Sequence, residues 1–130
     1  MEHPNVTLVR RSLAALESGE LPDMGEFLAE DVEWHQIGGK TVKGLETLAA
    51  EMGGMGDVDF QLEVHDVVGN DDHVVALVVA HVKASDDLEI TYRTAEVYHV
   101  VDGKITERWA MSDDTEAINR FFGLLAEQTV

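Results

Sequence analysis

His35 is the residue whose type and setting point most directly to chemistry. The segment 27–35 is followed by Gly38, Gly39 and residues 44–48, an order that predicts the end of a helix, a short strand carrying the imidazole, a glycine-bearing loop and the start of another helix. An imidazole can take a proton from a carbon next to a carbonyl at working pH, because its ordinary pKa is near neutrality. The alternative is a structural histidine, hydrogen-bonded at the edge of a cavity.

The composition indicates one acidic domain, residues 1–130. A chain of 130 residues can bury roughly two thirds of the surface that its unfolded form exposes. With 26 acidic and 9 basic residues the formal net charge is -17, which repels phosphate backbones and anionic lipid headgroups. We therefore expect no nucleic-acid partner and no membrane partner. The acids are scattered, as is typical of a solvated surface, and they also suit a salt-adapted host.

The sequence contains no cysteine, which excludes disulfides, thiolate catalysis and cysteine-ligated zinc. Residues 1–4 are followed by polar-interrupted sequence rather than by the apolar core of a signal peptide. The cytoplasm is therefore the expected location.

Helical spacing dominates the first part of the chain. After Pro4, apolar residues recur at helical spacing up to Gly19, which predicts an amphipathic first helix. Pro22 begins a short second helix, and residues 32–37 follow as a strand. A third helix begins near Gly44 and is predicted to stop at a run of glycines, Gly53, Gly54 and Gly56.

From residue 59 onward the hydrophobic period switches to two. Strands are predicted over residues 59–68, 73–83, 88–101 and 104–111, with turns between them. Four consecutive strands linked by hairpins make an antiparallel meander. Residues 115–127 predict a final helix with an apolar face.

This order of elements resembles the nuclear transport factor 2-like superfamily over essentially the whole chain. The spacing from residues 32–35 to Gly44, and the closing segment 102–109 with Asp113 after it, resemble the SnoaL-like polyketide cyclase and ketosteroid isomerase branch. The resemblance implies an α+β cone, in which a curved antiparallel sheet wraps on about three N-terminal helices and a short C-terminal helix follows. It implies no cofactor. The superfamily also contains dehydratases, epoxide hydrolases and transport adaptors, so the fold alone does not define a function.

Ketosteroid isomerases, which this chain resembles, place their general-base aspartate nine residues before the glycine that opens the third helix. His35 stands in that place relative to Gly44. The isomerase's oxyanion-hole tyrosine falls at Ser12 and its second acid near Val97, which cannot donate a proton. The resemblance therefore does not extend to a ketosteroid isomerase proper.

Asp113 is the second catalytic candidate. SnoaL-like cyclases resemble this chain in having an acid/base aspartate just after the last strand and a histidine on the preceding strand, which would be His99. An aspartate and a histidine in an apolar cone suffice for an intramolecular aldol reaction, because one group removes the α-proton and donors hold the enolate. The alternative is that Asp113, followed by Glu116, caps the final helix.

The turn at residues 102–103 decides whether this pair can meet. A two-residue loop would place His99 beside Thr106, on the face opposite Trp109 and Asp113. A three-residue loop with a bulge would place His99 opposite Glu107 and on the same side as Asp113. The sequence leaves both alternatives open.

Several other residues carry weaker signals. Aromatic and sulfur side chains on the strands could wall a substrate pocket or belong to the core, namely Trp34, Tyr92, Tyr98, Trp109 and Met111. Glu96 and Arg108 could form a cross-strand ion pair near the cavity, although exposure to solvent is the more usual outcome. No metal site is expected, because His65, His73, His81 and His99 stand on separate strands without ligand spacing.

The sequence thus predicts a protein that binds a small apolar or aromatic carbonyl compound. If it is an enzyme, it is a cofactor-independent isomerase or cyclase in which His35 and Asp113 perform acid/base chemistry. The alternative is a non-catalytic ligand-binding or interaction module. Because residues 74–82 are apolar on both faces of their strand, we also expect a homodimer that forms through the sheet.

Overall fold

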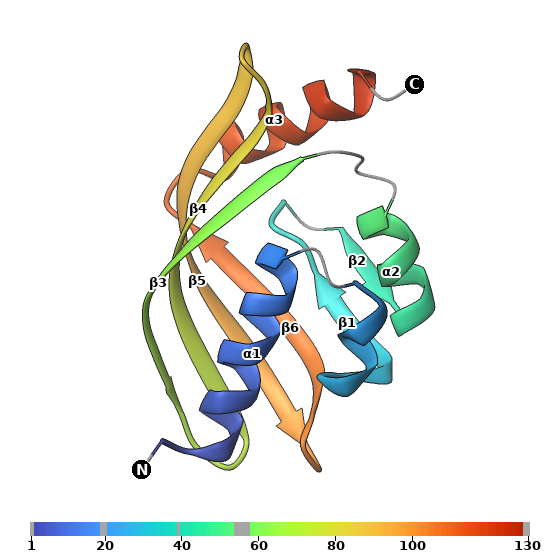
Figure 1. Cartoon of the computed structure of the whole chain (residues 1–130), viewed down its shortest axis with the longest axis vertical. Helices are drawn as coiled ribbons and strands as arrows, with labels where there is room; N and C mark the ends of the chain where they lie inside the picture. The colour runs from blue at the N-terminus through green and yellow to red at the C-terminus, as the bar shows by residue number, and fades with distance from the viewer. Residues whose placement is uncertain (1, 19–20, 39, 54–57, 129–130) are drawn as a thin grey trace.

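A single curved sheet wrapped around the first helix organises the molecule (Figure 1). The structure is a computed structural model, and it describes residues 2–18, 21–38, 40–53 and 58–128. The elements in chain order are α1 (Pro4–Ser18), the 3-10 helix η1 (Leu21–Glu26), β1 (Leu28–His35), β2 (Thr41–Lys43), α2 (Leu45–Gly53), β3 (Asp59–Gly69), β4 (His73–Ser85), β5 (Leu88–Val101), β6 (Lys104–Ser112) and α3 (Thr115–Gln128). Within these described residues, no helix is long and apolar enough to cross a membrane.

The six strands follow the order β2-β1-β6-β5-β4-β3. All neighbours are antiparallel except β1 and β6, which pair in parallel. Figure 1 shows α1, η1 and α2 on one side of the sheet and α3 at the end near the β4–β5 hairpin. The predicted α+β cone is therefore confirmed, with two 13- and 14-residue strands, β4 and β5, forming most of its wall.

Two details differ from the elements predicted from sequence. β1 begins at Leu28 rather than at residue 32 and ends at His35, so Leu28 belongs to the strand and not to the short helix before it. The strand β2 was not predicted at all, because three residues are too few to reveal a period in the sequence. Part of the predicted glycine run, residues 54–57, lies outside the described residues.

The core forms where α1, η1 and α2 press on the inner face of the sheet. Val9 and Leu13 of α1 are buried there together with Leu48 of α2, because each helix presents one apolar stripe to the strands. A second, smaller cluster joins α3 to the far ends of β4 and β5, through Ala80, Val82, Leu88, Phe121 and Leu125. The space between these two clusters contains the pocket described below.

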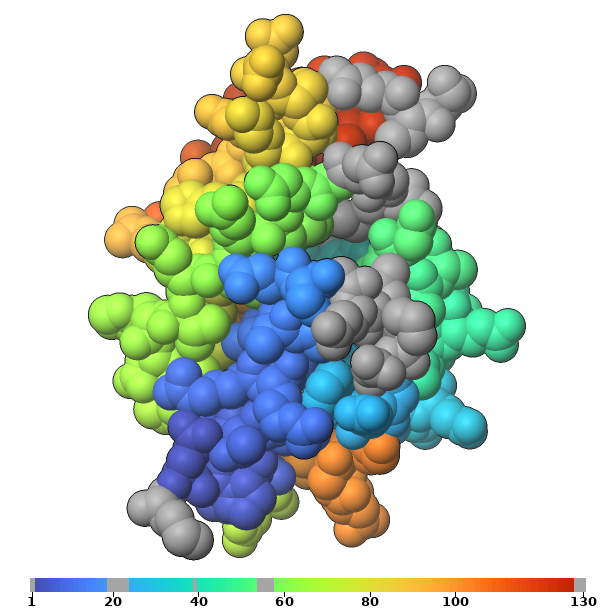
Figure 2. Space-filling view, viewed as in Figure 1, coloured from blue at the N-terminus to red at the C-terminus, as the bar shows by residue number. Residues whose placement is uncertain are grey.

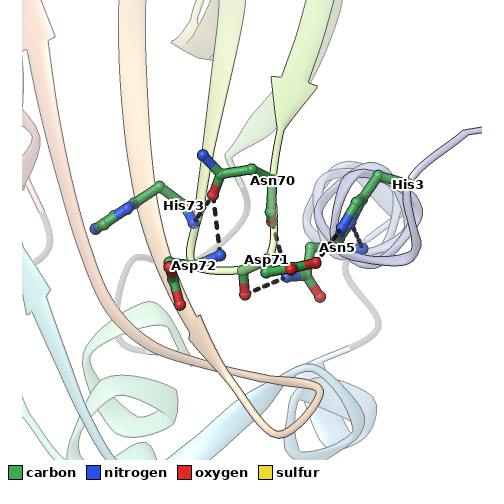
Figure 3. Close-up of polar contacts among 6 residues, drawn as sticks. All are labelled: His3, Asn5, Asn70, Asp71, Asp72 and His73. Carbon is green, nitrogen blue, oxygen red and sulfur yellow. Dashed lines mark hydrogen bonds and ion pairs between the residues drawn. The ribbon is translucent and has the colours of Figure 1, made fainter.

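Polar contacts attach the start of α1 to the β3–β4 turn (Figure 3). The His3 ring contacts the Asp71 carboxylate at 2.9 Å, and the Asn5 amide donates to the carbonyls of Asn70 and Asp71, at 3.1 Å in each case. Figure 3 shows the His73 side chain pointing away from these contacts. The attachment fixes α1 at the end of the sheet away from α3, so the cone is closed there.

The turn between β5 and β6 is a two-residue loop. Asp102 and Gly103 both have positive φ angles, 51° and 78°, and Val101 pairs with Lys104. Positive φ at both central residues matches the twist of a hairpin, and glycine adopts it without steric cost. The loop is therefore the first of the two predicted alternatives.

The register beyond this loop is nevertheless that of the second alternative, because β6 contains a β-bulge. Thr106 is an extra residue on β6, so His99 pairs with Glu107 and Tyr98 pairs with Arg108. The Thr106 hydroxyl donates to the carbonyl of His99 at 3.2 Å, which holds the bulge in place. If these same residues paired without a bulge, Arg108 would lie opposite the outward-facing Val97 and would leave the interior.

Inserting an alanine after Thr106 should cost far more stability than removing the Thr106 hydroxyl. We expect Thr106→Val to lower the free energy of unfolding by about 1 kcal/mol, the usual value of one hydrogen bond. With the single-residue bulge retained, the insertion moves Arg108 opposite the outward-facing Val97 and leaves the buried Glu96 without its partner, which should cost about 3–5 kcal/mol. Urea unfolding of both variants measures the difference, and equal losses would contradict this role of the bulge.

Candidate functional site

A pocket of about 790 Å³ opens between the end of α1, the end of α2, the β1–β2 loop and α3. Figure 2 shows α1 in blue beside β3 in green, covering the interior from this side of the molecule. The walls are largely apolar, with Leu16, Trp34, Met52, Phe60, Leu62, Ile118 and Phe122 among the lining residues. Gly38, with a φ of 99°, lies so close to the Asn119 side chain of α3 that a Cβ would collide with it. This contact joins the β1–β2 loop to α3 at the rim.

A buried ion pair lies on the inner face of the sheet at the floor of the pocket. Glu96 of β5 and Arg108 of β6 both line it, and the side chain of each is only 10% exposed. Glu96 Oε1 accepts hydrogen bonds from Arg108 Nη2 at 3.0 Å, from Arg108 Nε at 3.3 Å and from the Tyr98 hydroxyl at 2.8 Å. From the residues that the structure describes, Glu96 Oε2 accepts only one, from the Thr94 hydroxyl at 3.0 Å. The second oxygen therefore keeps a lone pair that can face a ligand.

The other contacts of Arg108 anchor it to β1. Its Nη1 donates to the carbonyl of His35 at 3.2 Å, and its guanidinium lies 4.6 Å from the centre of the Trp34 ring. The Trp34 ring in turn meets the Tyr98 ring edge to face, with centroids 6.5 Å apart. Arg108 is therefore fixed from β1 and in turn positions Glu96.

The two tyrosines beside this pair remain protonated far above neutral pH. Burial raises the pKa of Tyr92 to about 12, and the nearby Glu96 carboxylate adds to the effect. Burial likewise raises the pKa of Tyr98 well above its ordinary value of 10.0, again with a contribution from Glu96. Desolvation alone would lower the pKa of Arg108, but the carboxylate of Glu96 raises it above its usual value. The site thus holds one carboxylate acceptor among permanent donors.

Tyr92 is the donor that remains available. It lines the pocket, and its hydroxyl makes no hydrogen bond within the parts of the chain that the structure describes. Tyr98 lies deeper, where it lines a small adjoining cavity against α1 with Ser12, Trp34 and Glu96. An incoming polar group would therefore meet the Tyr92 hydroxyl as a donor and Glu96 Oε2 as an acceptor.

The structure places His35 and His99 on the outer face of the sheet. His35 follows Trp34 in β1, so its side chain points away from the pocket and contacts Thr41 and Glu107, both at 2.7 Å. The His99 ring stacks on that of His73 at 5.0 Å between centroids. Neither ring lines the pocket. This placement does not support acid/base catalysis by these histidines within the cone.

Asp113 is also remote from the pocket. Its exposed carboxylate accepts hydrogen bonds from Arg93 at 2.8 and 3.2 Å, and this guanidinium lowers the pKa of Asp113. The residue that caps α3 is its neighbour Asp114, whose Oδ1 accepts from the backbone N–H of Ala117 at 3.1 Å. Asp113 therefore neither faces the cavity nor caps the helix, and the geometry does not support a catalytic role in the cone.

The five aromatic and sulfur residues that could wall a substrate pocket divide between the two faces, with Tyr92 lining the pocket as described above. Trp34 lines the pocket, and Tyr98 lies on the same inner face. Trp109 and Met111 lie on the outer face of β6, where the Met111 side chain is 53% exposed. The division follows from the alternation of side chains along a strand, which places the neighbour of inward-facing Arg108 outside.

The sequence did not identify Glu96 as a buried residue of the pocket. Solvent exposure of Glu96 and Arg108 was the more usual expectation, and it is wrong. The second acid was placed near Val97, which faces outward, whereas the adjacent Glu96 faces inward. The signal that could have found it is the period-two series Tyr92, Thr94, Glu96 and Tyr98, which puts polar groups on the face that must cover α1.

A family model described as the SnoaL-like domain matches residues 9–108 of this chain. The match spans well over half of the sequence, so the protein belongs to the SnoaL-like family. The predicted resemblance to this family is thereby confirmed. No functionally curated protein matches the chain in sequence.

Solved structures with the same fold carry different activities. An LEH-like epoxide hydrolase from M. tuberculosis is 21% identical with a TM-score of 0.78, over 95% of this chain and 93% of that one. IdmH from Streptomyces antibioticus, proposed to be a polyketide cyclase, is also 21% identical with a TM-score of 0.73, over 91% and 98%. An NTF2-like protein of unknown function from Burkholderia pseudomallei is 21% identical with a TM-score of 0.80, over 92% and 97%. At these identities the likeness shows the fold alone.

The raised tyrosine pKa values predict an unusual alkaline titration. The chain has two tyrosines, Tyr92 and Tyr98, so the folded protein should develop little tyrosinate absorbance at pH 10, whereas the unfolded chain is half ionised there. Because the unfolded state releases these protons first, stability should fall as the pH rises from about 10 toward about 12. Spectrophotometric titration with and without denaturant measures this. A native midpoint near pH 10 would contradict the burial of both hydroxyls.

Proposed function

We propose that this protein binds a small, largely apolar carbonyl compound in the cone and removes a proton from the carbon next to that carbonyl. The observation that carries the proposal is a pair of groups in one apolar pocket: among the described residues, Glu96 Oε2 accepts a single hydrogen bond and the Tyr92 hydroxyl makes none. Glu96 is the general base in this scheme. The function is thus that of a cofactor-independent isomerase or cyclase.

Each group has one task in the reaction. The Glu96 carboxylate takes the α-proton, and the electron pair of the broken C–H bond moves onto the carbonyl oxygen, where the Tyr92 hydroxyl donates a hydrogen bond. Arg108 holds the carboxylate in place. Returning the proton to a different carbon gives isomerisation, whereas attack of the enolate on a second carbonyl gives cyclisation.

Two features support small-molecule chemistry over other roles. The pocket volume of about 790 Å³ falls in the range of small-molecule sites, and a few polar groups converge on an apolar lining. IdmH, with the same fold, is proposed to be a polyketide cyclase. In this scheme Glu96 takes the task that the sequence suggested for His35 and Asp113, which contribute no side chain to the cavity.

A non-catalytic binding module is the second candidate, and one observation favours it. The Glu96 carboxylate already accepts hydrogen bonds from Tyr98, Arg108 and Thr94, which occupy much of its acceptor capacity and hold it in one orientation. The exchange experiment below separates the two functions.

Glu96→Gln should abolish proton abstraction from a bound ketone. We expect the wild-type protein to exchange the α-protons of small aromatic ketones for deuterium in D2O, followed by NMR, and Glu96→Gln to slow the exchange about 10²- to 10⁴-fold. Asp113→Asn is the matched control and should exchange at the wild-type rate. Exchange that survives Glu96→Gln would refute the assignment of the base, whereas ketone binding without exchange would identify a binding module.

Tyr92→Phe tests the donor separately. Removing the hydroxyl should weaken binding of an aromatic ketone about tenfold, the worth of one hydrogen bond to a carbonyl, and should leave binding of the matched hydrocarbon unchanged. Quenching of Trp34 fluorescence in a Trp109→Phe background provides the binding signal. Equal losses for ketone and hydrocarbon would show that Tyr92 acts through packing alone.

We also propose that two copies associate through the outer face of the sheet. The centre of that face is apolar, with Leu77 41% and Met111 53% exposed beside the half-buried Val75, Val79, Val97 and Trp109. Since each copy carries a formal charge of -17, the association should strengthen with salt. Sedimentation should show a dimer that Leu77→Lys converts to a monomer. A wild-type monomer at high salt would contradict the proposal.

A further inference from the structure

Three metal-binding side chains converge on the outer face of the sheet, behind the pocket. Glu33 and His35 of β1 and Glu107 of β6 each offer one ligand atom, and these atoms all lie within 4.8 Å of one another. His35 Nε2 is 2.7 Å from Glu107 Oε2 and 4.0 Å from Glu33 Oε2. The parallel register sets Glu33 opposite Glu107, and alternation along β1 brings His35 to the same face.

The imidazole is held in the orientation that a metal ligand needs. His35 Nδ1 contacts the Thr41 hydroxyl of β2 at 2.7 Å, which leaves Nε2 aimed at the two carboxylates. Such a contact to the second ring nitrogen fixes the ring and its tautomer in metal sites. The carbonyl of His35 is anchored in addition by Arg108 from the opposite face. Three strands therefore position one histidine.

Charge and access both favour a cation at this point. Two carboxylates face one imidazole, and the side chains of Glu33, His35 and Glu107 are 42%, 33% and 35% exposed, so an ion can reach them from solvent. The Lys43 ammonium is 3.8 Å from Glu33 Oε1 and only partly balances the cluster. The formal charge of -17 raises the local concentration of cations around the whole protein.

We propose that Glu33, His35 and Glu107 form a binding site for a divalent cation of the zinc type. Imidazole nitrogen and carboxylate oxygen are both zinc ligands, and three of them leave a fourth position for water. Two ligand atoms on a tetrahedral zinc lie about 3.3 Å apart at bond lengths near 2.0 Å. The separations from His35 Nε2, 2.7 and 4.0 Å, bracket that value, and all three ligand atoms lie within 4.8 Å of one another, so side-chain rotations that move the carboxylate oxygens by about 1–2 Å complete the site. The ion would cross-link β1 to β6 across the one parallel pairing of the sheet.

The same sheet supplies a matched control. His81 Nδ1 contacts the Thr91 hydroxyl at 2.9 Å, and His81 Nε2 contacts Glu63 Oε2 at 3.2 Å. This arrangement is like that of His35, except that only one carboxylate contacts the Nε2 atom. Among the residues that the structure describes, three ligands converge only at the first site.

Calorimetric titration of the whole protein with Zn²⁺, together with thermal unfolding, tests the site. We expect one equivalent of Zn²⁺ to bind and to raise Tm, because an ion that binds only the folded state stabilises it. His35→Gln and Glu107→Gln should each weaken binding at least about tenfold and remove most of the Tm shift. His81→Gln should behave as wild type, and Lys43→Ala should tighten binding several-fold.

The Glu33→Gln variant controls for a folding defect, since the Glu33 carboxylate is 42% exposed and its ion-pair contacts are long, at 3.8 and 4.0 Å. This variant should have the same Tm as the wild-type protein when both are metal-free, and it should still bind Zn²⁺ more weakly. Zn²⁺ binding that is unchanged by His35→Gln, or reduced equally by His81→Gln, would show diffuse binding to an acidic surface and would overturn the proposal. Since the readout is zinc binding and not turnover, the result is independent of the proposed acid/base function.

Discussion

The single extra residue in β6 is the constraint on which the interior depends. A two-residue hairpin without a bulge would place Arg108 on the outer face, where it could not meet Glu96. Thr106 shifts the pairing by one, and Arg108 then lies opposite Tyr98 on the inner face. Because side chains alternate along a strand, this one residue decides which groups of β6 face the pocket and which face solvent.

The buried pair of Glu96 and Arg108 gives the pocket its polar floor. Two charges at 10% exposure are costly to desolvate, and they persist here because both oxygens of the carboxylate accept hydrogen bonds and each of the three guanidinium nitrogens donates one. The same carboxylate helps to keep the two tyrosines protonated. An apolar cone with this floor is suited to orient a small polar group of an otherwise apolar ligand.

Adjacent residues of β1 make contacts on the inner and the outer face of the sheet. Trp34 supports the guanidinium of Arg108 inside the cone, while His35 joins Glu107 outside it. Arg108 connects the two faces through the backbone carbonyl of His35. The outer cluster and the inner pocket therefore share one rigid strand pairing, although their chemistry is separate.

The sequence by itself determined the helices, the four long strands and the hairpin turns, because each of these follows from local periodicity and from residues such as Gly103 that favour a turn. The family resemblance also followed from the order of these elements. The candidate site did not follow. Whether Glu96 or Val97 faces inward, and whether His35 meets the pocket or Glu107, depends on strand register and on the non-local pairing of β1 with β6. A shift of one residue reverses every side chain of a strand. Only the tertiary structure decides the register, because packing against α1 and a bulge in β6 set it. No local sequence pattern predicts that bulge.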